Sequence, residues 1–173
     1  MCSSDLRFLT LLHRDQHVLR GLGPTTRAAL GMEIDVAERG TVGRTNGAMM
    51  RTALAGLAFA FHESAARREW ISASARKTHA HDSAVGCAVV MSAAFSAAAT
   101  IPRPYDLLGV MKSEAAHAPH ARVLCDAIDA IDTWAPNSAG VSLDPVETLL
   151  AVLRTVLDAR NCEDAYRRAC LLG

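Results

Sequence analysis

The sequence SAVGCAVVMSAAFSAAATIP spans residues 83–102 and contains no charged side chain over its 20 residues. That length is nominally enough for a helix to cross a bilayer, but Ala, Ser and Gly predominate, and these insert weakly compared with Leu or Ile. Small side chains recur every fourth position, at Ala84, Ala88, Ser92 and Ser96, so that neighbouring helices can approach closely. We therefore predict a helix buried inside a helical bundle, with a membrane span as the less favoured alternative.

Segments on both sides of this helix also follow a helical pattern. Asp82 or Ser83 is expected to cap the buried helix, and Asn161 to cap a last helix that continues to Gly173. Apolar residues recur at helical spacing over residues 5–20, 24–39, 47–61, 63–77, 105–116, 118–134 and 146–159, the last with Leu149, Leu150, Leu153, Val156 and Leu157 inward. Because no alternating strand, internal repeat or low-complexity linker interrupts this pattern, we predict an all-α fold.

Length and composition limit the class of protein. The 173 residues are expected to form a single domain, residues 1–173, large enough to hold a core without disulfides or metal. Lys+Arg 18 balances Asp+Glu 18, and aromatic residues make up 5%, which argues against nucleic-acid binding. Five cysteines without a Cys-x-x-Cys spacing and a start without a signal-peptide pattern favour the reducing cytoplasm.

The seven histidines raise the question of a metal site. His79 and His81 lie two residues apart, so they could share a metal only on a loop or a strand. His117 and His120 are three apart and could share a helix face. No Glu or Cys is placed to complete either set, and we favour exposed or helix-terminal histidines. No catalytic residue and no metal ligand is assigned from the sequence.

The stretch GRTNGAMMR, residues 43–51, is the most distinctive candidate for ligand binding. A glycine-flanked turn leads directly into an Ala/Met helix, where free backbone N–H groups could hold an anion such as a phosphate. The side chain of Asn46 could cap that helix or face a ligand, and from spacing alone the cap is favoured.

This stretch resembles the ADP-ribosylglycohydrolase family, which includes ADP-ribosyl-[dinitrogen reductase] glycohydrolases and hydrolases of ADP-ribosyl-arginine and ADP-ribosyl-serine. The resemblance rests first on TNGAMMRTA, residues 45–53, and on Thr78-His79 about 30 residues later. GLGPTTRAAL, residues 21–30, is similar to the helix entry before that motif, and DAYRRACLLG, residues 164–173, to the run that leads into a second metal motif. The resemblance therefore covers nearly the whole chain.

The resemblance implies an orthogonal all-helical bundle around two magnesium ions, in which water cleaves the glycosidic bond of ADP-ribose attached to a protein or a small molecule. It also implies that Thr45, Asn46 and Gly47 line the ADP-ribose site and that His79 lies beside the phosphates or ribose. The expected partners are ADP-ribose or an ADP-ribosylated protein, with no nucleic acid and no membrane.

The chain departs from the family pattern in its acidic motifs. An Asp-Asp-Thr type motif is expected before residue 21 and an Asp-x-Asp-Thr motif after residue 173, and these residues contain neither. We therefore expect a partial domain that lacks the terminal helices with the magnesium ligands, exposes apolar surface and self-associates through it. The alternative to a hydrolase is a metal-free remnant that binds ADP-ribose or a protein.

Overall fold

The computed structural model describes residues 10–11, 14–15, 22–35, 39, 42–102 and 105–172. All regular elements in this part of the chain are helices, so the predicted all-α class is confirmed. The elements are α2 (Pro24–Ala29), α3 (Gly47–Thr52), the 3-10 helix η2 (Ala53–Ala58), α4 (Ser64–Ala75), α5 (Asp82–Thr100), α6 (Leu107–Ala115), α7 (Ala121–Asp129), the 3-10 helix η3 (Ile131–Thr133), α8 (Pro145–Asp158) and α9 (Cys162–Leu171).

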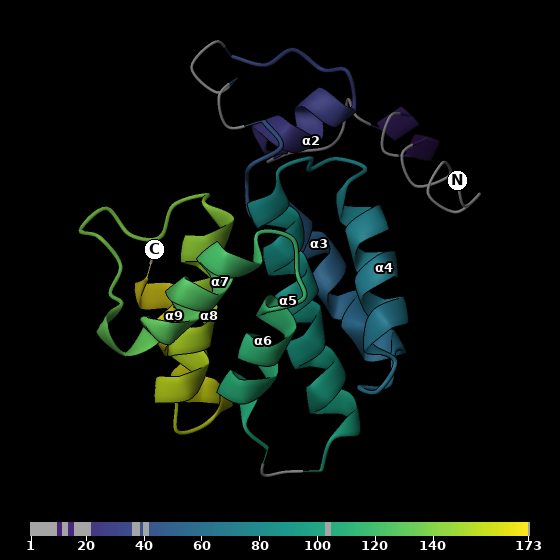
Figure 1. Ribbon diagram of the computed structural model, residues 1–173. Coiled ribbons are helices and arrows are strands. Elements are labelled where there is room, and N and C mark those ends of the chain that lie inside the picture. Colours follow the sequence, from purple (N-terminus) through teal and green to yellow (C-terminus); the bar gives the residue numbers. More distant parts are fainter. Residues whose placement is uncertain are drawn as a thin grey trace.

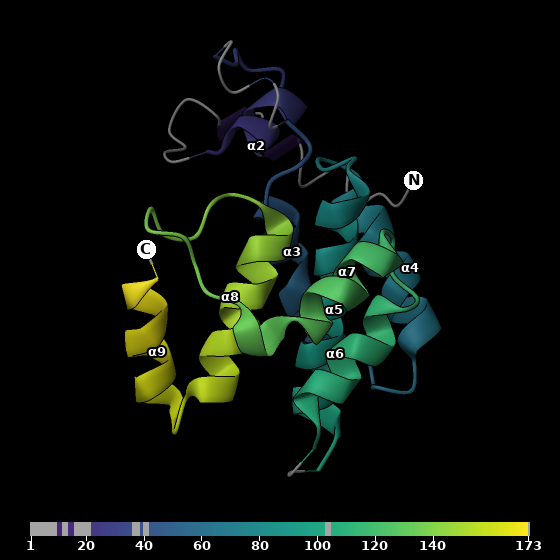
Figure 2. The same cartoon turned by 60° about the vertical axis from the view of Figure 1, so that its left-hand side comes forward.

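Helix α5 is the centre of the bundle, as its uncharged sequence predicts. It contacts α3, η2, α4, α6, α7 and α8, which surround it in Figures 1 and 2. All residues from Ser83 to Ala93 are buried. By length and composition α5 is also the one helix in the described residues that could cross a membrane, but 72% of its most apolar window is buried inside the protein.

The surrounding helices each place an apolar face against α5 or its neighbours. The buried side chains include Ile71 and Ala75 of α4, Met111 and Ala115 of α6, Leu124 and Ile128 of α7, and Leu149 and Leu153 of α8. Because these positions recur at three- or four-residue spacing, each helix buries one stripe of apolar side chains and exposes its other side to water.

The cap of α5 differs from the prediction. His81, and neither Asp82 nor Ser83, occupies the cap position, and its Nδ1 accepts a hydrogen bond from the backbone N–H of Ser83 at 3.2 Å. The cap of α9 is as predicted, since Oδ1 of Asn161 accepts from the N–H of Asp164 at 2.9 Å.

The helix predicted over residues 24–39 is much shorter. It ends at Ala29, because Gly31 adopts a left-handed φ of +70° and residues 32–35 have no helical structure. The helix predicted from residue 47 splits into α3 and the 3-10 helix η2, which reaches only Ala58. Most of the helix predicted over residues 5–20 lies outside the described residues.

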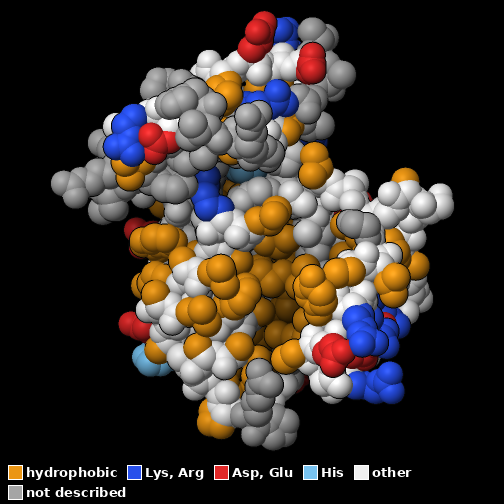
Figure 3. Space-filling model, turned by 180° about the vertical axis from the view of Figure 1, so that it is seen from behind, with side chains coloured by type: hydrophobic (Ala, Val, Ile, Leu, Met, Phe, Trp, Pro, Cys, Tyr) orange, Lys and Arg blue, Asp and Glu red, His pale blue; other side chains and the backbone are white. Residues whose placement is uncertain are grey.

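The outer face of α8 corrects the prediction that Val156 and Leu157 point inward. Their exposed fractions are 46% and 43%. Val152 and Val156 border two hollows of about 220 and 390 Å³, one between α5, α6 and α8 and the other between α8 and α9. Figure 3 shows hydrophobic side chains gathered in a hollow on the back of the molecule. The chain therefore carries a large exposed apolar surface.

Candidate functional site

The loop before α3 and the turn between α4 and α5 lie side by side, although more than 30 residues separate them in the sequence. The backbone N–H of His81 donates to the carbonyl oxygen of Gly43 at 3.2 Å. Gly43 has a φ of +81°, a conformation that L side chains rarely adopt, and the N–H of Gly43 donates to Oγ1 of Thr25 at 2.9 Å. The start of α2 therefore joins the same cluster.

His79 lies at the centre of this cluster and is only 1% exposed. Its Nε2 lies 3.0 Å from Oγ1 of Thr45, and its Nδ1 lies 2.7 Å from Oγ1 of Thr78. Thr45 is itself buried, and its hydroxyl donates to Oγ1 of Thr25 at 3.1 Å. Both ring nitrogens of His79 thus have partners inside the protein.

Gly47 allows α3 to begin directly against the imidazole. A Cβ on Gly47 would lie 3.1 Å from Nε2 and 3.2 Å from Cε1 of His79, tighter than ordinary side-chain packing. A larger residue at this position would therefore push the ring away from Thr45. The sequence places a glycine where the backbone and the ring need to be close.

Asn46 occupies the cap position of α3, but its side chain makes no capping hydrogen bond. The favoured prediction of a helix cap is therefore wrong. Instead, Nδ2 of Asn46 donates to Oγ1 of Thr148 on α8 at 3.0 Å, and its backbone N–H donates to the carbonyl oxygen of Leu143 at 2.9 Å. Asn46 thus ties the start of α3 to the loop before α8 and to α8 itself, about 100 residues further along the chain.

Burial and, to a smaller extent, the positive charge of Arg51 together lower the pKa of His79 from 6.5 to about 4. Arg51 comes from α3, and its guanidinium donates to Oγ1 of Thr78 at 2.8 Å and to the carbonyl oxygen of Ser74 at 3.0 Å. His79 is therefore a neutral imidazole at physiological pH. A neutral ring can both donate and accept a hydrogen bond.

The depressed pKa of His79 predicts a pH-dependent stability. Between pH 4 and 6.5 the unfolded chain binds more protons at this residue than the folded chain, so the free energy of unfolding rises with pH in this window. Above pH 6.5 the folded chain keeps the full stability that the neutral His79 ring provides. As the pH falls towards 4, the free energy of unfolding decreases by about 3 kcal/mol at most. Urea unfolding of the wild type and of His79→Gln between pH 4 and 7 measures it.

In His79→Gln, the free energy of unfolding is expected to depend less steeply on pH than in the wild type. His62→Gln, at an exposed histidine, is the matched control and should keep the wild-type slope. Equal slopes for the wild type and His79→Gln would show that His79 has the same pKa in the folded and unfolded chains.

The two histidine pairs considered as metal ligands do not form a metal site. Among the described residues no three His, Cys, Asp or Glu side chains converge as metal ligands would. His79 is bonded to two threonines, whereas the ring of His81 meets that of His120 edge-on, with centroids 6.1 Å apart. The preference for exposed or helix-terminal histidines is confirmed for His81, His117 and His120 and is wrong for the buried His79. The described residues therefore do not fit the two magnesium ions that the resemblance implies.

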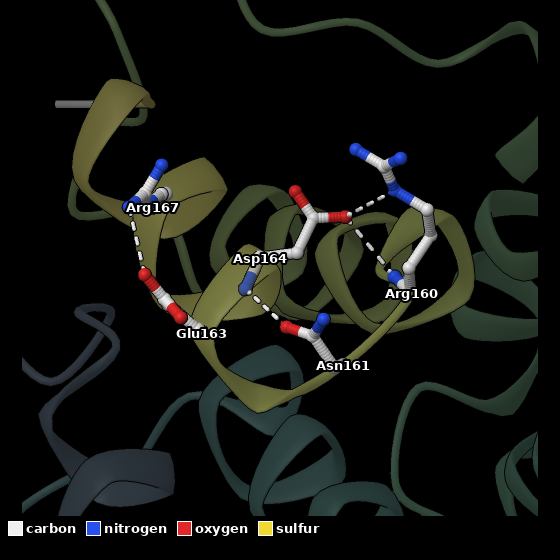
Figure 4. A pocket seen from close by; sticks show the side chains of 5 residues that line it. All are labelled: Arg160, Asn161, Glu163, Asp164 and Arg167. Atoms are coloured by element: carbon white, nitrogen blue, oxygen red, sulfur yellow. Dashed lines mark hydrogen bonds and ion pairs between the residues drawn. The ribbon is translucent and has the colours of Figure 1, made fainter.

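The hollows described for the chain are not lined by the four predicted site residues, although Thr148, to which Asn46 donates, lines the hollow between α8 and α9. Besides the two apolar hollows beside α8, a third of about 250 Å³ lies at the start of α9. Figure 4 shows that its charged side chains pair with one another, with Arg160 beside Asp164 and Arg167 bonded to Glu163. None of the three is lined by Thr45, Asn46, Gly47 or His79.

Sequence reasoning singled out Thr45, Asn46, Gly47 and His79, and the structure brings all four together at the start of α3. Their assignment to substrate binding stays a prediction. Three further residues of the cluster were missed: Thr25, Arg51 and Thr78. All three belong to the stretches that carry the resemblance, but only the hydrogen bonds show that they support Thr45 and His79.

Comparison with known proteins gives one positive result. A family model described as ADP-ribosylglycohydrolase matches residues 4–173, which is nearly the whole chain. Neither the curated proteins nor the solved structures contain a match.

Proposed function

Because the chain belongs to the ADP-ribosylglycohydrolase family, we propose that the cluster around Thr45 and His79 forms the ADP-ribose-binding part of a hydrolase of that type. The observation that supports this proposal is that the two parts of the motif, residues 45–53 and Thr78-His79, lie in contact in the structure. Thr45 and His79 are 34 residues apart in the sequence, yet Oγ1 of Thr45 lies 3.0 Å from Nε2 of His79. The loop that would hold the ligand is thereby fixed in one shape.

The chemistry of the cluster suits a charged, hydroxyl-rich ligand. Asn46 and Gly47 are partly exposed at its surface, and the guanidinium of Arg44 is exposed beside them, 3.3 Å from Nε2 of His81. A diphosphate pairs well with a guanidinium, and ribose hydroxyls pair well with amide groups. We place the ligand on this outer side, with His79 beneath it.

The proposed reaction is hydrolysis of the bond between the anomeric carbon of ADP-ribose and a nitrogen or oxygen of its carrier. Water supplies the hydroxyl group that bonds to the anomeric carbon and the proton that the leaving nitrogen or oxygen receives. The described residues take part by binding and orienting ADP-ribose. None of them is assigned to proton transfer, and no step is derived through magnesium.

Titration calorimetry of ADP-ribose, together with assays on ADP-ribosyl-arginine and ADP-ribosyl-serine peptides, tests this proposal. The expected result is binding of ADP-ribose, and release of ADP-ribose from a peptide when magnesium is added identifies a hydrolase. Binding without release in magnesium identifies the alternative, a metal-free ADP-ribose-binding protein. The absence of both binding and release would contradict the proposal.

Two variants show whether Asn46 contacts the ligand in the same titration. Asn46→Ala removes both the amide and its hydrogen bond to Thr148, whereas Thr148→Val keeps the amide and removes this hydrogen bond together with the one that the Thr148 hydroxyl donates to the carbonyl oxygen of Asp144. A contact with ADP-ribose predicts about tenfold weaker binding for Asn46→Ala alone. Equal losses in both variants would leave Asn46 as a link between α3 and α8.

The two apolar hollows beside α8, both bordered by Val156, lead us to expect self-association of the chain. Exposed apolar patches of this kind drive proteins together in water. Sedimentation velocity should show species larger than a monomer as the concentration rises, and Val156→Glu, within the hollow, should shift them towards the monomer. Val123→Glu, at an exposed valine of α7 outside the hollow, is the matched control. A wild type that stays monomeric at every concentration would refute this expectation.

A further inference from the structure

A continuous series of hydrogen bonds runs through the cluster, from the guanidinium of Arg51 to the hydroxyl of Thr25. Nη1 of Arg51 donates to Thr78 at 2.8 Å, and Oγ1 of Thr78 lies 2.7 Å from Nδ1 of His79. On the other side of the ring, Nε2 lies 3.0 Å from Thr45, whose hydroxyl donates to Thr25 at 3.1 Å. Each residue of this series is hydrogen-bonded to at least one residue from a different segment of the chain.

The chemistry of Arg51 sets the direction of these bonds. A guanidinium only donates, so Oγ1 of Thr78 accepts from Arg51 and its own O–H is free to donate to Nδ1 of His79. The positive charge on the Nδ1 side also favours a lone pair there over an N–H. On the other side of the ring, the single proton of the Thr45 hydroxyl is donated to Thr25, so Oγ1 of Thr45 can only accept from Nε2. The one proton of the neutral imidazole therefore lies on Nε2.

We propose that Arg51 and Thr78 are positioning residues, which hold His79 as its Nε2–H tautomer and thereby fix Thr45 and the loop of residues 43–47 for the ligand. The positioning of the loop is a property of the free protein. Its consequence for ADP-ribose rests on the proposed function. The inference adds residues that act through His79 and assigns His79 itself a supporting role beneath the ligand.

The packing explains why one tautomer matters. His79 is 1% exposed, so no water molecule from bulk solvent can replace a lost partner at either nitrogen, and a buried polar atom without a partner is costly. The start of α3 also lies close to Nε2 and Cε1 of the ring, because a Cβ added at Gly47 would come within 3.1 Å and 3.2 Å of these atoms. We therefore expect a substitution of Thr78 to alter the positions of Thr45 and Gly47, on the opposite side of the imidazole.

The test compares Thr78→Val, which removes the hydroxyl, with Thr78→Ser, which keeps it. Ring ¹⁵N spectra of histidine-labelled protein at pH 7 report which nitrogen carries the proton, and His79→Gln identifies the signals of His79. The wild type and Thr78→Ser should show the proton on Nε2. Thr78→Val should show a mixture of tautomers, shifted amide signals for residues 43–47 and about tenfold weaker ADP-ribose binding.

Arg51 is tested in the same spectra. Arg51→Lys keeps the positive charge and should keep the Nε2–H tautomer, whereas Arg51→Met should allow the second tautomer and raise the pKa of His79. Thr133→Val is the matched control, because the hydroxyl of Thr133 donates to the carbonyl oxygen of Ala130, just before η3 and far along the chain.

The spectra decide the inference even without a ligand. A wild-type ring with its proton on Nδ1, or a Thr78→Val variant with unchanged tautomer and unchanged loop signals, would overturn it. If the tautomer and loop signals respond as expected but the wild type binds no ADP-ribose, the positioning of the loop stands and the proposed function fails.

Discussion

Replacing Glu114 by leucine is expected to lower the free energy of unfolding by about 3–5 kcal/mol. The carboxylate of Glu114 on α6 lies 2.9 Å from Nη2 of Arg67 on α4, and the side chains of Arg67 and Glu114 are 0% and 6% exposed. Arg67 has few other partners: Nη1 lies 3.5 Å from the carbonyl oxygen of Phe61, and Nε has no partner among the described residues. The variant would leave a buried, uncompensated positive charge.

The double variant Arg67→Met, Glu114→Leu provides the decisive comparison. Apolar side chains of similar volume can replace a buried ion pair at little cost, so the double variant should recover most of the lost stability. Arg68, which also contacts Glu114 at 3.4 Å, is 26% exposed and can turn towards water. Urea unfolding measures the free energy of unfolding of all variants. The control is Glu69→Leu, at an exposed carboxylate of α4, and its stability is expected within about 0.5 kcal/mol of the wild type. A double variant as unstable as Glu114→Leu would show that the loss comes from packing rather than from charge.

Gly86→Ala is the second substitution expected to have a large effect, with a loss of about 3 kcal/mol. Gly86 lies in the buried part of α5, where an added Cβ would overlap the backbone carbonyl oxygen of Pro119 and lie 2.7 Å from Cδ1 of Leu124. Alanine favours a helix over glycine by about 1 kcal/mol, but this gain is smaller than the cost of moving α7 away from α5. Thermal or urea unfolding should show the loss directly.

Gly23→Ala is the matched control, because an added Cβ there meets no atom of the described residues within 4 Å. Its expected effect stays within about 1 kcal/mol, the range of a change at a helix cap. If Gly86→Ala were as stable as the wild type, the close approach of α5 to the segment before α7 would be wrong.

The sequence was sufficient to predict the buried helix and the all-α class. Residues 83–102 carry no charge, and the resulting helix has no side that needs water, so its place at the centre follows from composition alone. Short segments were harder. The pattern over residues 24–39 continues past Gly31, yet the left-handed φ of +70° at that glycine ends α2 early.

Contacts between distant segments were beyond the reach of sequence reasoning. Local spacing predicted Asn46 as a helix cap, whereas its side chain bonds to Thr148, 102 residues away. A histidine next to a threonine gives no sign that it will be buried between two hydroxyl groups. Arg67 reads as part of a polar helix face, and only the fold brings it to Glu114. The family resemblance linked His79 with Thr45, Asn46 and Gly47 because it carries such long-range information, and the structure brings Thr45 and His79 together.

The central claim is that the cluster around Thr45 and His79 binds ADP-ribose. Titration of the ¹⁵N-labelled chain with ADP-ribose, followed by amide NMR spectra, tests this claim most directly because it shows where the ligand binds. The account predicts shifts concentrated at residues 43–47 and 78–81, while the signals of residues 160–167 at the start of α9 stay unchanged. Saturable shifts confined to α9 or to the apolar hollow, or no shifts at any ligand concentration, would contradict it.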